Sequence, residues 1–285
     1  MRITTPPAFS YELCYQFLER SPRELLHRCA GNDVVKLIGD SVVHISPGKD
    51  HLKVKFLTDT TAADREVVRQ YIVEWFDLAT DLSPFYRMAA KDKLLGPLAK
   101  QYYGYRIVGQ PDLFESLVWA VIGQQINLAF AYTLKGRFVE QFGGRHMLDG
   151  HTYYRFPLPG DAALLTDNDL LPLQFSRQKS KYVVAIAEAF ASGQLSREMV
   201  ATLPLQAAKE TLMKIKGVGN WTANYALMKT FRHPDAFPLE DAGLHNAIRQ
   251  QLKLASKPTL AEVQKIFKRY RGWEAYATLY LWKSL

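Results

Sequence analysis

Asp241 is the carboxylate in this chain that is best placed to do chemistry. It stands just before a predicted helix over residues 244–254, and the positive end of a helix favours an ionised carboxylate. Such a group can stabilise a developing cation or activate a water molecule. Glu240 is the second candidate, but neighbouring residues at a helix start point in different directions, so we expect only one to face a site. Asp241 can also be an ordinary helix N-cap, and the two roles are compatible.

A Gly-x-Gly turn formed by Gly217 and Gly219 is the second feature with chemical potential. The pattern predicts a helix over 205–215 before the turn and a helix over 221–231 after it. Glycines permit positive φ angles and let a ligand reach the backbone, and the free N–H groups at the start of the second helix attract phosphate. A tight helix connection without a ligand gives the same short pattern. Dinucleotide and Walker sites are excluded because their further glycines or Gly-Lys-Ser/Thr are missing.

The charge balance favours a polyanionic partner. Lysine and arginine outnumber aspartate and glutamate by 36 to 28, which gives a net charge of +8. The basic residues gather beside predicted helices in three groups, namely Arg177, Lys179 and Lys181; Lys209, Lys214 and Lys216; and Lys265, Lys268, Arg269 and Arg271. Lys214 and Lys216 therefore add charge directly before the Gly-x-Gly turn.

Several other classes of protein do not fit the sequence. The first residues contain no apolar signal core and the only cysteines are Cys14 and Cys29, so we expect a reducing cytoplasm. Polar residues interrupt every apolar run that could span a bilayer, so no membrane segment is expected. No His-Glu-x-x-His or Cys-x-x-Cys spacing occurs, and we predict no metal held by side chains.

The elements that position these residues divide into a sheet region and a helical region. Segments 34–38, 42–45 and 52–56 alternate between apolar and polar residues and are separated by turn sequences, which predicts an antiparallel meander. The next apolar residues, from Val67 to Phe76, have helical spacing, with Thr60 or Thr61 as the cap. We therefore predict an α+β chain whose N-terminal domain ends near residue 90.

All of the chain beyond the sheet region has the pattern of helices. Asp112 and Glu115 resemble a capping box before an apolar run that Gly143 and Gly144 end. A further helix is predicted over 181–192. The predicted domains are residues 1–90, residues 91–111 together with 231–285, which carry Asp241, and residues 112–230, which carry the Gly-x-Gly turn.

Longer segments of the chain resemble one known superfamily. The string Leu-x-x-Ile-x-Gly-Val-Gly-x-x-Thr-Ala, which begins at Leu212, closely resembles the helix-hairpin-helix motif of the base-excision DNA glycosylases. Residues 115–126 look like the helix of that superfamily that carries its duplex-penetrating residue, and residues 235–241 look like the segment that ends in its catalytic aspartate. A meander followed by helices is similar to the domain plan of bacterial 3-methyladenine DNA glycosylase II.

The resemblance implies roles for individual residues. It makes Asp241 catalytic, since 24 residues separate it from Gly217. It places Trp221, Tyr225, Trp273 and, from the N-terminal domain, Phe17 around the base, because an electron-poor cationic base is attracted to aromatic faces. For each of these rings, core packing is the alternative. Tyr276, Tyr280 and Trp282 are expected to be structural.

The resemblance also implies how DNA is bound. Gly217, Gly219, Lys214 and Lys216 would hold a phosphate, and Gln125 would fill the gap left by the flipped base. The relatives have an apolar wedge at that position, so Gln124 or Ile126 is the alternative. No cofactor is required, although backbone carbonyls around Gly217 are expected to bind a monovalent cation.

The expected function is that of a monofunctional DNA glycosylase, a bacterial cytoplasmic, nucleoid-associated monomer. It would flip alkylated purines, of the 3-methyladenine and 7-methylguanine type, from double-stranded DNA and hydrolyse the N-glycosidic bond. A bifunctional lyase is disfavoured because Trp221 occupies the place of the nucleophilic lysine. The alternatives are a glycosylase for a different damaged base and a non-catalytic DNA-binding protein that uses the hairpin only as a phosphate clamp.

Overall fold

An antiparallel sheet of five strands forms the N-terminal part of the molecule, and the computed structural model describes all residues from 1 to 285. The strand order is β1-β5-β4-β3-β2. The strands are β1 (Arg2–Thr4), β2 (Arg28–Ala30), β3 (Asp33–Ile38), β4 (Ser41–Pro47) and β5 (His51–Phe56). The predicted meander is confirmed as β3, β4 and β5. Strands β1 and β2 have three residues each, too few to show an alternation in the sequence.

Two helices pack against this sheet. Helix α2 (Ala62–Trp75) contacts β3, and α1 (Tyr11–Glu19) contacts β2. Thr61 caps α2 as expected: its side chain accepts a hydrogen bond from the Asp64 N–H, and the Asp64 carboxylate accepts one from the Thr61 N–H. Helix α1 is not predicted from the sequence, and it matters for the site because it carries Phe17.

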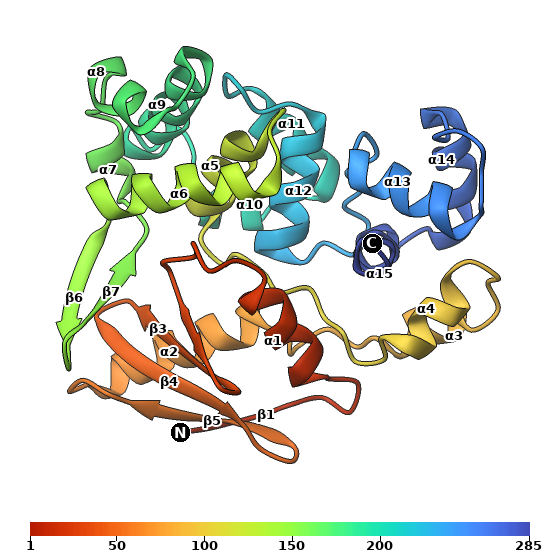
Figure 1. The fold of residues 1–285 in the computed structure, drawn as a ribbon, viewed down its shortest axis with the longest axis horizontal. Coiled ribbons are helices and arrows are strands. Elements are labelled where there is room, and N and C mark those ends of the chain that lie inside the picture. Colours follow the sequence, from red (N-terminus) through yellow and green to blue (C-terminus); the bar gives the residue numbers. More distant parts are fainter.

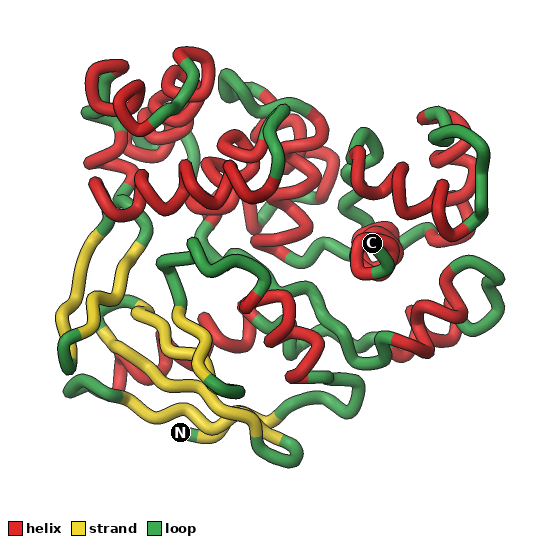
Figure 2. The backbone as a smooth tube through the Cα atoms, in the orientation of Figure 1, coloured by secondary structure: helices red, strands yellow, loops and turns green.

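Helices dominate the remainder of the chain (Figures 1 and 2). They are α3 (Ser83–Ala89), α4 (Leu95–Gln101), α5 (Leu113–Gly123), α6 (Leu128–Phe142), α7 (Pro159–Ala162), α8 (Asp167–Leu170), α9 (Arg177–Ala191), α10 (Arg197–Ala201), α11 (Leu205–Met213), α12 (Asn220–Phe231), α13 (Ala242–Gln251), α14 (Leu260–Phe267) and α15 (Glu274–Lys283), with short 3₁₀ turns at Leu171–Leu173 and Lys268–Tyr270. The predicted α+β fold class is therefore confirmed. Helix α9 begins before residue 181 because Ser176 caps it.

The predicted single helix over 112–143 is two helices. Helix α5 ends at Gly123, and Gln125 adopts a left-handed conformation with φ 56°. Asn127 then starts α6 by accepting a hydrogen bond from the Phe130 N–H. A left-handed residue cannot continue an α-helix, so the chain turns at residues 124–127. This turn is exposed beside the Gly-x-Gly hairpin.

A β-hairpin interrupts the region that was expected to be entirely helical. Strands β6 (Gly144–Leu148) and β7 (His151–Arg155) pair across Asp149 and Gly150, which both have positive φ angles. Asp-Gly is a strong hairpin signal that the sequence-based prediction overlooked. Tyr153 of β7 packs with Leu37 and Val42 of the N-terminal sheet, so the hairpin connects the two regions (Figure 1).

One apolar core runs through both regions. A single cluster of 70 buried residues includes side chains of the N-terminal sheet and of the helices. Helix α5 is its centre: it packs between α9 and α12 and is buried from Leu113 to Ile122. The domain boundaries predicted from sequence therefore stay a prediction. None of the helices combines the length and apolar character that crossing a membrane requires.

Candidate active site

Aromatic side chains surround a cavity of about 400 Å³ next to Asp241, which we call the aromatic pocket. Trp221 and Tyr225 lie on one face of α12 because four residues separate them, and their rings stack with centroids 5.2 Å apart. Lys229 follows four residues later on the same face. The remaining large side chains that line the pocket are Phe17, Arg20, Trp119, Ile126, Leu128, Leu279 and Trp282.

Three N–H groups hold the carboxylate of Asp241. Oδ1 accepts hydrogen bonds from the Leu244 backbone N–H at 2.7 Å, which makes Asp241 the N-cap of α13, and from Trp282 Nε1 at 2.7 Å. Oδ2 accepts one from Trp221 Nε1 at 3.0 Å. The carboxylate lines both the aromatic pocket and an open groove next to it. It is thus fixed in orientation and still reachable from outside.

Gly243 permits this arrangement. A Cβ atom at this position would lie 3.0 Å from Asp241 Oδ1 and 3.5 Å from the Trp282 ring. The 3.0 Å contact is closer than usual for a Cβ atom, so a side chain here would press on the carboxylate oxygen, whereas the indole lies at an ordinary contact distance. The sequence carries no separate signal for this role, because Gly243 looks like an ordinary helical glycine.

Glu240 does not face the pocket. Its side chain is exposed and accepts a hydrogen bond from Asn220 Nδ2 at 2.7 Å, so it ties the segment before α13 to the start of α12. Asp241 and Glu240 therefore point in different directions, as the sequence reasoning expects. Of the two carboxylates, only Asp241 lines the aromatic pocket.

The assignment of Trp273 to the pocket is wrong in this structure. Trp273 precedes α15 and packs against Phe85 and Tyr276, at centroid distances of 5.9 and 6.0 Å. Trp282, which was expected to be structural, lines the pocket instead. The two indoles lie at opposite ends of α15, about 13 Å apart along its axis at 1.5 Å per residue, so only one end reaches Asp241.

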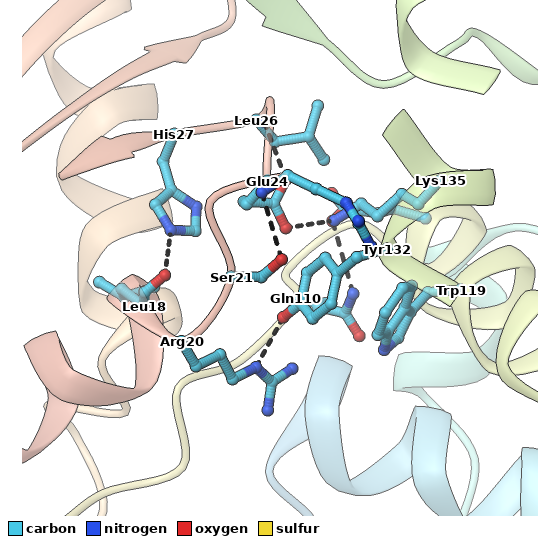
Figure 3. Close-up of polar contacts among 12 residues, drawn as sticks. Leu18, Arg20, Ser21, Glu24, Leu26, His27, Gln110, Trp119, Tyr132 and Lys135 are labelled. Carbon is cyan, nitrogen blue, oxygen red and sulfur yellow. Dashed lines mark hydrogen bonds and ion pairs between the residues drawn. The ribbon is translucent and has the colours of Figure 1, made fainter. Parts of the chain in front are cut away.

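The N-terminal region completes the pocket through α1. Phe17 lines it as expected. Arg20, which sequence reasoning missed, has its guanidinium 3.8 Å from the centroid of the Phe17 ring. Arg20 Nε also donates a hydrogen bond to the Tyr132 hydroxyl at 2.6 Å (Figure 3). Neither residue has a sequence signal of its own, because α1 itself is not evident in the pattern.

A buried ion network holds this N-terminal segment against the helices (Figure 3). Lys135 of α6 contacts Glu24 at 3.0 Å and Glu115 at 3.3 Å. Burial alone would raise the pKa of Glu24, but Lys135 and His27 outweigh it and lower that pKa to about 2. Burial also opposes the charged form of Lys135, and the two carboxylates reverse this and raise its pKa.

The Gly-x-Gly hairpin joins α11 to α12 and has the expected backbone features. Gly217 has φ 93°, and a Cβ there would lie 2.2 Å from Tyr182 Cγ, so this position requires glycine. Gly219 begins α12, and a Cβ there would meet no atom within 4 Å. The first N–H groups of α12 have no acceptor within the protein. Lys214 and Lys216 are exposed beside them.

The turn at residues 124–127 lies against this hairpin. Gln124 Nε2 donates to the Gly217 carbonyl and to Thr222 Oγ1, both at 3.1 Å. Gln125 is exposed and Ile126 is half-buried. Gln124 is therefore occupied by the hairpin, whereas the side chains of Gln125 and Ile126 are not held by it. The monovalent cation stays a prediction, and the Gly217 carbonyl has one lone pair left for it.

Lys179 does not belong to the exposed basic surface on which sequence reasoning placed it. Its Nζ donates to the carbonyls of Val121, Ile122 and Gln124 at 2.6 to 2.9 Å, so it caps the C-terminus of α5. Burial lowers its pKa to about 8. Lys179 therefore fixes the start of the exposed turn, whereas its neighbours Arg177 and Lys181 are exposed.

The hairpin, the turn and the aromatic pocket form one continuous surface. The groove beside the pocket is lined by Gln125, Gly219 and Asp241, and a second groove on the other side of the hairpin is lined by Gln125, Gly219 and Tyr182. A phosphate can meet the amides of α12 while a planar group lies against the aromatic rings beside the Asp241 carboxylate.

Comparison with known proteins agrees with this geometry. A family model described as HhH-GPD superfamily base excision DNA repair protein matches residues 118–271, and a model for the N-terminal domain of 8-oxoguanine DNA glycosylase matches residues 25–117. The chain is 42% identical to the DNA-3-methyladenine glycosylase of Bacillus subtilis, over 99% of this chain and 96% of that protein.

Solved structures share the fold. A 3-methyladenine DNA glycosylase from Archaeoglobus fulgidus superposes with a TM-score of 0.85 at 24% identity, covering 99% of this chain and 97% of that one. A 3-methyladenine DNA glycosylase from Schizosaccharomyces pombe in complex with abasic DNA has a TM-score of 0.59 at 26% identity, covering 69% and 93%. By the family match and the full-length relative, this chain belongs to the HhH-GPD superfamily of base excision DNA repair proteins.

Proposed function

We propose that this protein is a monofunctional DNA glycosylase that removes alkylated purines, of the 3-methyladenine and 7-methylguanine type, from double-stranded DNA. The observation that carries the proposal is the fixed carboxylate of Asp241 between an aromatic pocket and the hairpin surface. The full-length relative from Bacillus subtilis is named for the same activity. We further propose that it acts as a monomer on nucleoid DNA in the cytoplasm.

In the proposed reaction the flipped base enters the aromatic pocket. A cationic alkylated purine is attracted to the faces of Trp221 and Tyr225. As the glycosidic bond breaks, positive charge develops on the sugar, and the Asp241 carboxylate stabilises it. An alkylated purine leaves as a neutral molecule, so the reaction requires no strong acid. The free lone pairs of Oδ2 can also orient the attacking water.

Binding of the duplex is assigned to the hairpin and the turn. The N–H groups at the start of α12 would receive a phosphate, with Lys214 and Lys216 beside it. Gln125, exposed in a left-handed conformation at the tip of the turn, would fill the gap in the base stack. Ile126 is the alternative, because it lines the pocket and both grooves.

Two alternatives predict different products. A phosphate clamp without catalysis would not need a carboxylate fixed by two indoles, and it would release no base. A glycosylase for another damaged base would share the site, and a lyase would need an amine where Trp221 stands. Borohydride reduces the imine of a lyase to a permanent crosslink between protein and DNA. We expect no such crosslink for this protein.

The test is incubation with methylated duplex DNA, followed by identification of the released bases and of the DNA product. We expect 3-methyladenine and 7-methylguanine, an unbroken strand with abasic sites, and no crosslink under borohydride. The D241N variant should bind DNA as the wild type does and release no base, because an amide cannot stabilise the oxocarbenium ion. Wild-type turnover by D241N would rule out the role of Asp241.

A further inference from the structure

Lys229 is a buried cation in the wall of the aromatic pocket that the proposed reaction does not use. It is 3% exposed and lines both the aromatic pocket and a small inner cavity of about 50 Å³ behind it. Asp241 binds Trp221 in the first turn of α12, and Lys229 lies two turns further along, about 12 Å along the axis. Asp241 and Lys229 both line the aromatic pocket, so a base whose glycosidic bond is at Asp241 can direct its far edge toward Lys229.

The ammonium group of Lys229 has donors to spare. Nζ donates to the Val108 carbonyl and lies 4.6 Å from the centroid of the Phe17 ring, and no carboxylate forms an ion pair with it. An ammonium group has three protons, so two remain without a carboxylate or carbonyl partner in the protein. Burying a cation without a paired anion costs free energy of folding, so buried charges are normally paired. A side chain that departs from this pattern is expected at a functional site.

Other charged groups around Lys229 are already engaged or are themselves positive. The titratable groups packed on it or sharing its cavities are Cys14, Arg20, His27, Lys36, Tyr71, Glu115, Tyr132, Lys135, Tyr225 and Asp241. Glu115 pairs with Lys135, and the Asp241 carboxylate is held by indoles at the other end of the pocket. Burial, with Arg20 nearby, lowers the pKa of Lys229 to about 7.

We propose that Lys229 is a specificity-determining residue that donates a hydrogen bond to the far edge of the flipped base and thereby assists release of purines that are uncharged before cleavage. This inference rests on the proposed glycosylase function. When the bond between C1′ and an uncharged purine breaks, both electrons go to the base, which departs as an anion. The hydroxyl of a water molecule goes to C1′, and the water's second proton ends on the released purine.

A donor beside the departing base affects the two charge classes differently when each reaction is counted from free enzyme and free DNA. An uncharged purine leaves as an anion, and the hydrogen bond from Lys229 stabilises that anion until the proton arrives. An alkylated purine enters the pocket as a cation, which the ammonium group repels, and leaves as a neutral molecule. For this class the easier departure is offset by weaker binding of the cation. Lys229 thus extends the pocket to uncharged lesions, whereas Trp221 and Tyr225 select cationic ones.

The test compares two bases that carry the same O6 carbonyl on the far edge, cationic 7-methylguanine and uncharged hypoxanthine, in otherwise identical duplexes. In K229M, the second-order rate constant for single-turnover release of hypoxanthine, measured below saturation, should fall about ten- to hundredfold, the range of a hydrogen bond to a charged group, while that for 7-methylguanine is kept or rises. K229R retains a cation and should recover hypoxanthine release. In the wild type the rate constant for hypoxanthine should fall from about pH 6 to about pH 8, and K229M should lose this dependence.

Each outcome separates this inference from the proposed function. An equal loss of both activities in K229M, or an unchanged ratio, overturns the role of Lys229 and leaves the glycosylase function in place. The same holds if the wild type releases 7-methylguanine but no hypoxanthine. If the wild type releases neither base, the proposed function itself fails. Thermal unfolding of K229M checks the fold, and removing an unpaired buried charge should not lower its stability.

Discussion

The carboxylate of Asp241 owes its orientation to two indoles that come from different helices. Replacing Trp282 by Phe keeps a ring in the pocket wall but removes the donor to Oδ1. A hydrogen bond to a charged group contributes about 1.5–3 kcal/mol, so we expect the single-turnover rate of base release to fall about tenfold or more. Affinity for a duplex with an abasic site should stay unchanged.

Trp273 provides the matched control for this prediction. It is the other tryptophan beside α15, and it packs against Phe85 away from the pocket. W273F should therefore release bases at close to the wild-type rate. If W273F is the slower of the two variants, the placement of both indoles is contradicted.

Residues of the site differ in how far the sequence alone could identify them. Asp241, Trp221 and Tyr225 could be placed because they stand at fixed distances from a recognisable hairpin. Trp282 could not, since its approach to Asp241 depends on how α15 packs on α13 and on the absence of a side chain at Gly243. Lys229 continues the four-residue spacing of Trp221 and Tyr225, so helical geometry alone could have placed it on the same face of α12. It is not among the pocket residues predicted from the sequence.

At the scale of elements, the two glycines of the hairpin are expected to have different roles, Gly219 in phosphate binding and Gly217 in the fold. A Cβ at Gly219 would meet no protein atom, so G219A should fold normally and place a methyl group where phosphate docks. We expect about tenfold weaker binding to damaged and undamaged duplexes alike, the size of one charge-assisted hydrogen bond. Fluorescence anisotropy measures this, and a loss confined to one lesion would argue against a phosphate contact.

G217A is the control for this prediction. At Gly217 a Cβ would lie 2.2 Å from Tyr182 Cγ, and φ is 93°. The substitution introduces both a steric clash and an unfavourable positive φ angle, so it should lower the melting temperature. G219A should not lower it. We expect both variants to lose DNA affinity, but only G217A to lose stability.

The ion network between α6 and the N-terminal segment predicts a pH dependence of stability. The folded pKa of Glu24 is lowered to about 2, so its contribution is complete above the ordinary carboxyl pKa and is lost as pH falls toward 2. K135M leaves Glu24 and Glu115 buried without their cation and should lower the free energy of unfolding by about 3–5 kcal/mol at neutral pH.

Urea unfolding at neutral and acidic pH measures this effect. In K135M protonation of the unpaired Glu24 carboxylate relieves the penalty, so the difference in the free energy of unfolding between variant and wild type should narrow as pH falls. A gap that stays constant would show that Lys135 acts by packing alone.

Elements with their own local signal were predictable, and those determined by tertiary contacts were not. The meander and the capped helix α2 follow from alternation and from Thr61. The split between α5 and α6 depends on the left-handed conformation of Gln125, and a glutamine in the sequence does not predict that conformation. Lys179 looked like a surface charge because sequence does not reveal that three carbonyls at the end of α5 converge on it.

For the whole molecule, one continuous core makes the sheet region part of the site. Phe17 and Arg20 reach the aromatic pocket from α1 only because the core and the Glu24 network hold both regions together. The pattern of strands and helices in the sequence predicts three domains, and it contains no signal for this shared packing. The pocket is thus a property of the assembled chain.

The distribution of charge over the molecule leads to the last prediction. The net charge is +8, and DNA affinity should fall linearly on a logarithmic scale with added salt, because each phosphate neutralised by the protein releases counterions. Lys214 and Lys216 are exposed beside the hairpin, and replacing both by glutamine should reduce the salt slope by about two. Lys53 is exposed on β5 and Lys49 is exposed in the turn before it. Strand β5 lies at the end of the molecule away from α11 and α12 (Figure 1). Their double glutamine variant changes the net charge equally and should leave the slope unchanged. Equal slopes for the two double variants would mean that overall charge, and not the hairpin surface, governs binding.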